Sequence, residues 1–202
     1  MDTDPTQHGE QPLAVVALGG HAFMHSDQPA TVEVHDRNAA EISAVLMTLV
    51  NRGYNIVITH GNGPQVGQLL RQADLTRDQV PAMPLDVLVA DNEGLLGYIL
   101  QQALLNQLKH LNITIYFVTM VTQVLVDEDD PAFAQPTKPV GRFMTQQEAE
   151  HYRDTLDWQV AEDTGRGWRR RVPSPRPKRV VQWRMIREAA LAGHIVIAAG
   201  GG

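Results

Sequence analysis

The sequence contains no cysteine. Disulfide bonds, thiolate zinc sites and cysteine nucleophiles are therefore excluded, and a reducing compartment fits the composition. Long apolar runs are missing as well, since none approaches the roughly 20 residues of a membrane-spanning helix. Residues 1–12 are polar and lack the basic and apolar regions of a secretory signal. We therefore expect a cytoplasmic protein that has no membrane partner.

A surplus of positive charge is also missing. The 17 basic and 23 acidic residues give a net charge of -6, whereas binding to a nucleic-acid backbone needs a basic face. The segment Arg166 to Arg179 is locally basic, but Trp168 is its only aromatic residue available for stacking on bases. We expect a solvated or dimer-contacting surface there and no nucleic-acid partner.

The histidines show no spacing that is typical of a metal site. His21 and His25 are four residues apart, but no carboxylate lies between them and no helix is predicted there. We therefore expect no metal site formed by the protein.

Short apolar runs that end in glycine organise the chain. Leu13–Leu18 and Asn55–Thr59 read as buried strands, and each runs into a glycine loop. Apolar residues recur at helical spacing between Ala39 and Val50, before a stop signal at Gly53. Two strand–glycine–helix units in succession predict an α/β fold with a parallel sheet.

The rest of the chain continues this pattern around one irregular segment. We predict helices at Leu85–Leu108 and Trp183–Ala192, and strands at Ile113–Val118 and Ile195–Ala199. Between them, residues 121–181 are rich in proline and turns, which indicates a small inserted subdomain of hairpins. The domain itself is predicted to span 13–202, after a polar tail at 1–12.

The two glycine loops are the candidate functional site of the chain. Open α/β sheets bind ligands at the carboxyl ends of their strands, and glycine lets the backbone approach an anion closely. Neither loop matches the dinucleotide or phosphate-loop fingerprints. Each loop alone could be a tight structural turn, but two at equivalent strand ends favour an anion-binding site.

The amino-acid sequences of these two loops resemble those of a known family. The segments Ala17-Leu18-Gly19-Gly20-His21-Ala22 and Thr59-His60-Gly61-Asn62-Gly63-Pro64-Gln65-Val66-Gly67 closely resemble the first two signatures of carbamate kinases. The likeness spans about Leu13 to Gly202. It continues through Pro84-Leu85-Asp86, Gly97-Tyr98, Val121-Thr122-Gln123-Val124, Asp130-Pro131-Ala132-Phe133, Pro136-Thr137-Lys138-Pro139, Gly165-Arg166-Gly167-Trp168-Arg169-Arg170, Val172-Pro173-Ser174-Pro175 and Ala199-Gly200-Gly201-Gly202.

The resemblance implies an amino-acid-kinase fold, with a mostly parallel sheet between helices and a protruding subdomain. It implies reversible phosphoryl transfer between carbamoyl phosphate and ADP, giving ATP and carbamate, in arginine or related catabolism. Mg²⁺ with ATP or ADP as cofactor, and a homodimer, are implied in the same way. In that family a C-terminal lobe holds the nucleotide. We expect that lobe to be absent here, and we expect this chain alone not to bind ATP.

The resemblance also suggests roles for particular residues. Backbone N–H groups of Gly19, Gly20, Gly61 and Gly63 would contact the substrate, together with the Asn62 side chain. Lys138 would act as a mobile catalytic cation, although it is a solvated loop lysine if read without the family. Gly200, Gly201 and Gly202 would lie close to the transferred phosphoryl group.

Two histidines of the loops leave alternatives open. The family usually has asparagine where this chain has His21, which offers one donor and one acceptor on a larger ring. His60 holds its loop by a hydrogen bond or takes part in catalysis. For the whole chain, the alternative to an enzyme is a non-catalytic small-anion-binding or dimerisation module derived from a carbamate kinase.

Overall fold

The computed structural model describes residues 11–25, 28–29, 31–109 and 115–201. The chain forms two compact units, each built from separate stretches of sequence. The first comprises residues 1–62, 89–123 and 181–202, and the second comprises residues 63–88 and 124–180. The predicted tail at 1–12 falls almost entirely outside the described residues, and the predicted domain limits stay a prediction.

A parallel sheet forms the centre of the first unit. Its strands are β1 (Leu13–Leu18), β2 (Asn55–His60), β9 (Ile195–Ile197) and β3 (Phe117–Thr119), in the spatial order β1-β2-β9-β3. All three pairings are parallel. The strand that comes last in the sequence therefore lies inside the sheet, between β2 and β3. The predicted third strand began at Ile113, whereas β3 begins at Phe117 and residues 110–114 lie outside the described part.

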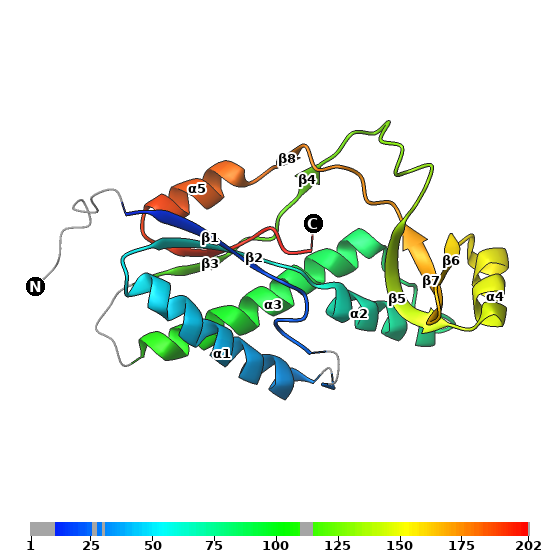
Figure 1. The fold of residues 1–202 in the computed structure, drawn as a ribbon, viewed down its shortest axis with the longest axis horizontal. Coiled ribbons are helices and arrows are strands. Elements are labelled where there is room, and N and C mark those ends of the chain that lie inside the picture. The colour runs from blue at the N-terminus through cyan, green and yellow to red at the C-terminus, as the bar shows by residue number, and fades with distance from the viewer. Residues whose placement is uncertain (1–10, 26–27, 30, 110–114, 202) are drawn as a thin grey trace, which may run out of the picture. The chain divides into compact units, whose positions relative to one another are not determined.

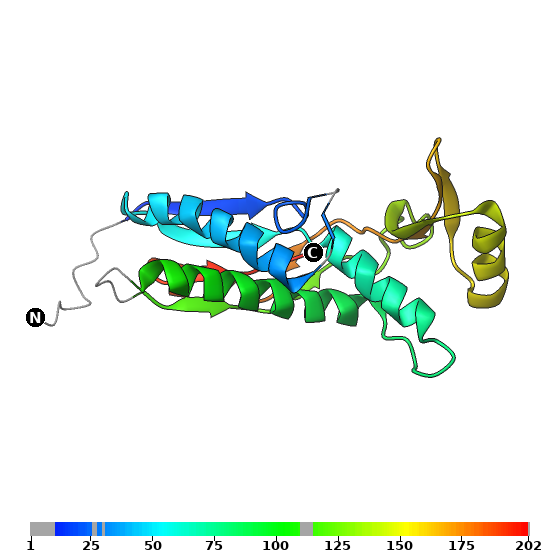
Figure 2. The same cartoon turned by 90° about the horizontal axis from the view of Figure 1, so that it is seen from below.

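Helices cover both faces of this sheet, as Figure 1 shows. On one face, α1 (Val32–Val50) and α3 (Leu85–Leu108) form the main apolar core with β2 and β9. The two helices lie beside each other along the strands in Figure 2. On the other face, α5 (Trp183–Leu191) packs Ala190 against Val57 and Val196. The predicted parallel α/β sheet between helices is confirmed.

Helix α1 shows why a sequence pattern can place the end of a helix better than its start. The helix begins after Thr31, whose side-chain oxygen accepts a hydrogen bond from the N–H of Val34 at 3.4 Å. It ends near the predicted residue, because Gly53 adopts a φ of 81° that few other residues tolerate. The predicted start at Ala39 was too late by two turns, since polar residues occupy the first part of the helix.

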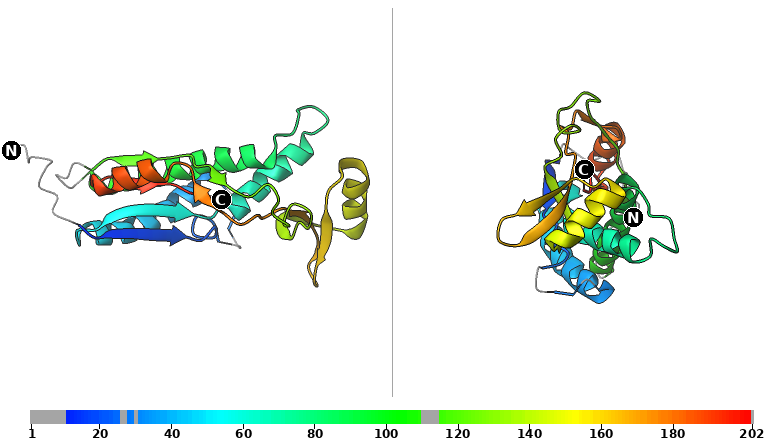
Figure 3. Two further views of the ribbon diagram at one scale, coloured as in Figure 1. Left: turned by 90° about the horizontal axis from the view of Figure 1, so that it is seen from above. Right: turned by 90° about the vertical axis from the view of Figure 1, so that its right-hand side faces the viewer.

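The second unit combines helices with short antiparallel sheets. Its elements are α2 (Gly63–Leu75), β4 (Val124–Leu125), β5 (Lys138–Met144), α4 (Gln146–Leu156), β6 (Val160–Asp163), β7 (Gly167–Val172) and β8 (Arg179–Val180). One sheet has the order β5-β7-β6, and β4 pairs with β8. Strand β5 packs against α2, and α4 lies against the three-stranded sheet, as Figure 3 shows.

Helix α4 was not predicted within the irregular segment. A capping box fixes its start: Thr145 accepts from the N–H of Glu148 at 3.2 Å, and Glu148 accepts from the N–H of Thr145 at 2.8 Å. Arg142 donates to the same glutamate at 2.6 Å. These interactions hold the pKa of Glu148 down at about 2, with the hydrogen bond from Arg142 as the largest cause.

The basic segment lies in this second unit, and several of its arginines are engaged within the unit. Arg169 donates to the carbonyl oxygen of Gly141 at 3.0 Å, and Arg170 lies over the ring of Trp158 at 4.5 Å. Arg171 donates to the carbonyl oxygen of Thr137 at 3.2 Å. These contacts give the arginines a structural role within the unit. None of the helices in the described part of the chain is long and apolar enough to cross a membrane.

Candidate functional site

Three glycine loops converge at one edge of the parallel sheet in the first unit. They follow β1, β2 and β9, whose carboxyl ends share that edge because the strands run parallel. Hydrogen bonds join the loops: the N–H of Gly61 donates to the carbonyl oxygen of Leu18 at 2.8 Å, and the N–H of Gly201 donates to that of His60 at 2.9 Å. The sequence placed these loops at strand ends, and the structure brings them together.

The first two loops approach so closely that a side chain does not fit between them. A Cβ atom at Gly61 would lie 2.8 Å from the backbone nitrogen of Gly20. The first loop is a tight turn, in which the N–H of Ala22 donates to the carbonyl oxygen of Gly19 at 2.9 Å. His21 occupies the third position of this turn and is exposed. The glycine at position 61 is therefore required by the packing of the two loops.

The third loop packs against the second in the same way. A Cβ atom at Gly200 would overlap the ring of His60, and one at Gly201 would overlap the side-chain amide of Asn62. Gly201 has a φ of 73°, and Ala199 has a φ of 53° although it carries a side chain. Residues with a Cβ rarely adopt this conformation, and such strain concentrates at functional sites. Gly202 lies outside the described residues.

Asn62 presents an unused hydrogen-bond donor at this junction. The residue is only 6% exposed, and its Nδ2 atom has no hydrogen-bond partner among the described residues. A buried amide nitrogen without a partner costs free energy, on the order of 1–3 kcal/mol. A ligand with an oxygen acceptor would remove that cost. This agrees with the predicted role of Asn62 as a substrate contact.

His60 is buried beside the loops. Burial lowers the pKa of its imidazole, because the charged form is disfavoured away from water. Its Nδ1 atom lies 3.4 Å from the carbonyl oxygen of Gly61, and its ring packs edge-on against Phe23 with centroids 5.8 Å apart. These contacts fit the structural alternative, in which His60 supports the loops as a neutral ring.

Two buried polar residues of α3 were missed from sequence, and one of them, Glu93, borders the third loop. Glu93 and Asn92 of α3 are 4% and 1% exposed. Glu93 accepts from the backbone N–H of Thr122 at 2.7 Å, and its Cγ atom lies 3.0 Å from the point where a Cβ of Gly200 would stand. Both side-chain polar atoms of Asn92 lack hydrogen-bond partners in the described structure. A signal was present: Asn92 stands four residues from both Leu88 and Leu96, on the buried stripe of the helix.

The remaining predicted residues belong to the second unit. Gly63 is the first residue of α2 and follows Asn62 directly in the chain. Lys138 is the first residue of β5 and is exposed. The structure does not place Lys138 relative to the glycine loops, and its catalytic role stays a prediction.

The described residues at the loops include no cluster of metal-ligating side chains. Across the described residues, no three histidine or carboxylate side chains gather closely enough to hold a metal ion. Glu93 is a single carboxylate, and Mg²⁺ in nucleotide sites takes one or two carboxylates together with phosphate oxygens. The Glu93 carboxylate already accepts a hydrogen bond from Thr122, and we assign no described residue to Mg²⁺.

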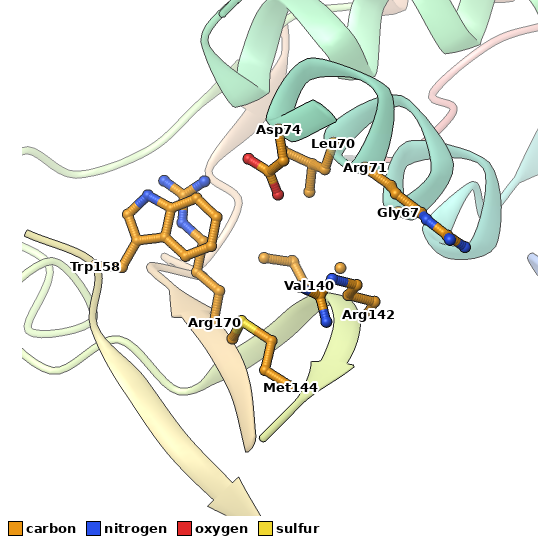
Figure 4. A pocket seen from close by; sticks show the side chains of 10 residues that line it. Gly67, Leu70, Arg71, Asp74, Val140, Arg142, Met144, Trp158 and Arg170 are labelled. Atoms are coloured by element: carbon orange, nitrogen blue, oxygen red, sulfur yellow. The ribbon is translucent and has the colours of Figure 1, made fainter. Parts of the chain in front are cut away.

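A pocket in the second unit has different features (Figure 4). It lies between α2 and the strands β5 and β7, and its cavity volume of about 20 Å³ holds about one water molecule. Two of its charged groups have partners within the unit: Arg170 stacks on Trp158, and Asp74 forms an ion pair with Arg77 at 2.9 Å. We interpret this pocket as part of the packing between α2 and the sheet.

Comparison with known proteins agrees with the arrangement of the loops. Residues 12–202 match the model of the amino acid kinase family. A carbamate kinase of Pyrococcus horikoshii is 45% identical over 190 residues, and a carbamate kinase-like protein of Escherichia coli is 43% identical over 193 residues. The structure of a Giardia lamblia carbamate kinase bound to AMP-PNP superposes with a TM-score of 0.86 at 38% identity.

These matches cover most of this chain and only part of the relatives. The P. horikoshii alignment covers 93% of this chain and 60% of the relative, and the G. lamblia alignment covers 96% of this chain and 61% of that structure. The chain thus spans about three fifths of the length of these relatives. The family match over nearly its whole length shows that the chain belongs to the amino acid kinase family.

Proposed function

We propose that this chain provides the substrate-binding part of a carbamate kinase-like phosphotransferase. In the proposed reaction, the bond between phosphorus and the carbamate oxygen of carbamoyl phosphate breaks. A terminal phosphate oxygen of ADP forms the new bond to phosphorus, so that ATP and carbamate are the products. The observation that carries the proposal is the junction of three glycine loops around the unpartnered amide of Asn62.

The chemistry of phosphoryl transfer suits such a junction. The protein mainly positions the reactants and stabilises negative charge on the transferring group. Backbone N–H groups of Gly19 and Gly20 would donate to the anion, and Asn62 would donate to a substrate oxygen. The N–H of Gly61 was expected to do the same, but it already donates to the carbonyl oxygen of Leu18. Gly63, His21 and Gly200 to Gly202 complete the proposed contacts, and Lys138 would supply a positive charge.

Several parts of the proposal rest on the relatives alone. They are named carbamate kinases, and one solved structure holds AMP-PNP. We infer a nucleotide with Mg²⁺ as cofactor, but assign neither to a residue of this chain. A cytoplasmic location and a place in arginine catabolism belong to the proposal on the same basis.

Binding of carbamoyl phosphate to the 202-residue protein tests the substrate site. We expect saturable shifts of the backbone amide signals of Gly20, Gly61 and Gly200 in NMR spectra, and a loss of affinity of about fivefold or more in Asn62→Ala. Asn106→Ala, on the exposed side of α3, is the matched control and should bind as the wild type does. No binding to the wild type, or equal affinity of Asn62→Ala, would contradict the proposal.

Turnover distinguishes an enzyme from its non-catalytic alternative. A coupled assay follows ATP formation from carbamoyl phosphate and ADP with Mg²⁺. Binding with turnover supports the kinase, whereas binding without turnover supports a small-anion-binding module derived from one.

We further propose that the chain forms a homodimer through α3. An apolar stripe on this helix is exposed to solvent: Leu95 is 43%, Tyr98 65% and Leu105 49% exposed. Exposed contiguous apolar side chains are typical of interaction surfaces. Analytical ultracentrifugation tests this, since a monomer at micromolar concentration would contradict it.

A further inference from the structure

The side chain of Glu93 connects two segments that meet at the glycine loops. Its carboxylate accepts from the backbone N–H of Thr122 at 2.7 Å, and from the hydroxyl of Thr122 at 3.2 Å. The Cγ atom of the same side chain borders Gly200, on which His60 also packs. Glu93 thus contacts the third glycine loop and the segment that follows β3.

Thr122 stands at a defined point of the first unit. The chain leaves β3 at Met120, whose N–H donates to the carbonyl oxygen of Ile197 at 2.9 Å. Gln123, the next residue after Thr122, donates from its N–H to the side chain of Gln182 at 2.9 Å and accepts from the N–H of Val181 at 2.8 Å. The two stretches that lead out of this unit, at 123 and 181, are therefore joined directly beside the residue that Glu93 holds.

A carboxylate in this environment is costly to keep. Glu93 is 4% exposed, and no basic side chain of the described residues forms an ion pair with it. Burial raises the pKa of its carboxyl group, while the hydrogen bonds from Thr122 lower it in part. Among the described residues, the titratable side chain of His60 also borders Gly200, the glycine that Glu93 contacts. A buried carboxylate that has no cation beside it must be stabilised in another way, and the two hydrogen bonds from Thr122 provide that stabilisation.

We propose that Glu93 is a positioning residue, whose carboxylate holds Thr122 and thereby fixes the segment after β3 against the third glycine loop. Its consequence for the reaction rests on the function proposed above. The contact with Thr122 does not, and it can be tested separately. Glu93 is not proposed to touch the substrate.

NMR spectroscopy of the ¹⁵N-labelled protein tests the contact. In the wild type, we expect the Thr122 amide proton to titrate with a midpoint above 4.5, the ordinary value for glutamate. Glu93→Gln should abolish this titration and retain slow amide exchange at Thr122, because the amide oxygen still accepts the hydrogen bond. Glu93→Ala should accelerate that exchange about tenfold or more, since bonds to charged groups contribute about 1.5–3 kcal/mol.

Controls separate this role from general destabilisation. Glu41→Gln, at an exposed position of α1, should leave the Thr122 signal unchanged. Thr122→Val keeps the backbone N–H and should keep its titration, which preserves the test if Glu93→Ala fails to fold. The assignment would be overturned if the Thr122 amide proton does not titrate in the wild type. It would also be overturned if Glu93→Gln accelerates amide exchange at Thr122 as much as Glu93→Ala does.

Sulfate, a tetrahedral anion with constant charge, probes the effect on the loops. Glu93→Gln and Glu93→Ala both lack the negative charge and differ in the contact to Thr122. We expect sulfate to bind Glu93→Ala about threefold or more weakly than Glu93→Gln, as followed by the amides of Gly61 and Gly200. Equal affinity of the two variants would contradict a positioning role. If sulfate binds no variant, the proposed function fails, and the Thr122 titration still decides the role of Glu93.

Discussion

Replacing Gly61 by alanine tests whether the junction of the loops is built as the structure shows. The new Cβ atom would stand 2.8 Å from the backbone nitrogen of Gly20, well inside van der Waals contact. Both groups are backbone-bound, so neither can rotate away and the first two loops must separate. Overpacking of this kind costs about 1–3 kcal/mol. For a chain of this size, that cost lowers the melting temperature by about 2–12 °C.

The same loop provides a matched control. A Cβ atom at Gly63 would meet no other atom within 4 Å, so Gly63→Ala should melt within about 2 °C of the wild type. Circular dichroism measures the melting of both variants, and NMR titration with sulfate measures their anion binding. We expect about tenfold weaker binding for Gly61→Ala, equivalent to 1.4 kcal/mol. Equal melting and equal binding of the two variants would refute the close approach of the loops.

Three other predictions concern charge and association. Glu93→Gln should melt at a higher temperature than the wild type at pH 7.5, and at the same temperature as the wild type at pH 4. The reason is that the raised pKa of Glu93 lowers stability only where the carboxyl group is ionised in the folded state. An equal gain in melting temperature at both pH values would contradict this. Glu148→Gln should lower the free energy of unfolding by at most about 1 kcal/mol at pH 7, because its ion pair with Arg142 is exposed. The difference in stability from the wild type should shrink as the pH falls toward 2, where the wild-type carboxyl group takes up its proton. Denaturant unfolding at both pH values measures it. Tyr98→Asp should shift the proposed dimer toward monomer in ultracentrifugation, whereas Glu41→Gln, at an exposed position of α1, should not.

The sequence predicts the sheet and its loops because their signals are local. The runs at Leu13–Leu18 and Asn55–Thr59 are apolar, β-branched and closed by glycine, and each forms a strand close to its predicted bounds. The convergence of the loops follows from parallel pairing, which a strand–helix–strand order implies. By contrast, the central place of β9 depends on pairing over more than 70 residues, and no local pattern fixes it.

Other features were missed for identifiable reasons. Helix α4 has a polar composition that resembles a loop, although Thr145 and Glu148 stand at the spacing of a capping box. Glu93 interrupts an apolar stripe, and its partner Thr122 is 29 residues away, so its burial becomes visible only in the fold. The position of Lys138 relative to the loops depends on how two units pack, which remains a prediction.

The central position of β9 has a consequence for how the protein is made. Strands β1, β2 and β3 are synthesised first, yet β2 and β3 have no contact as sheet neighbours until residues 195–197 are inserted between them. Until β9 has been synthesised, the nascent chain holds two separate sheet fragments, with unpaired backbone groups along the facing edges of β2 and β3. Unpaired strand edges are prone to aggregation until β9 pairs with them, and pairing across long sequence separations is slow. We expect the sheet of this unit to close only after β9 has emerged from the ribosome, and the folding yield to depend on chaperones more than that of a sheet assembled in chain order.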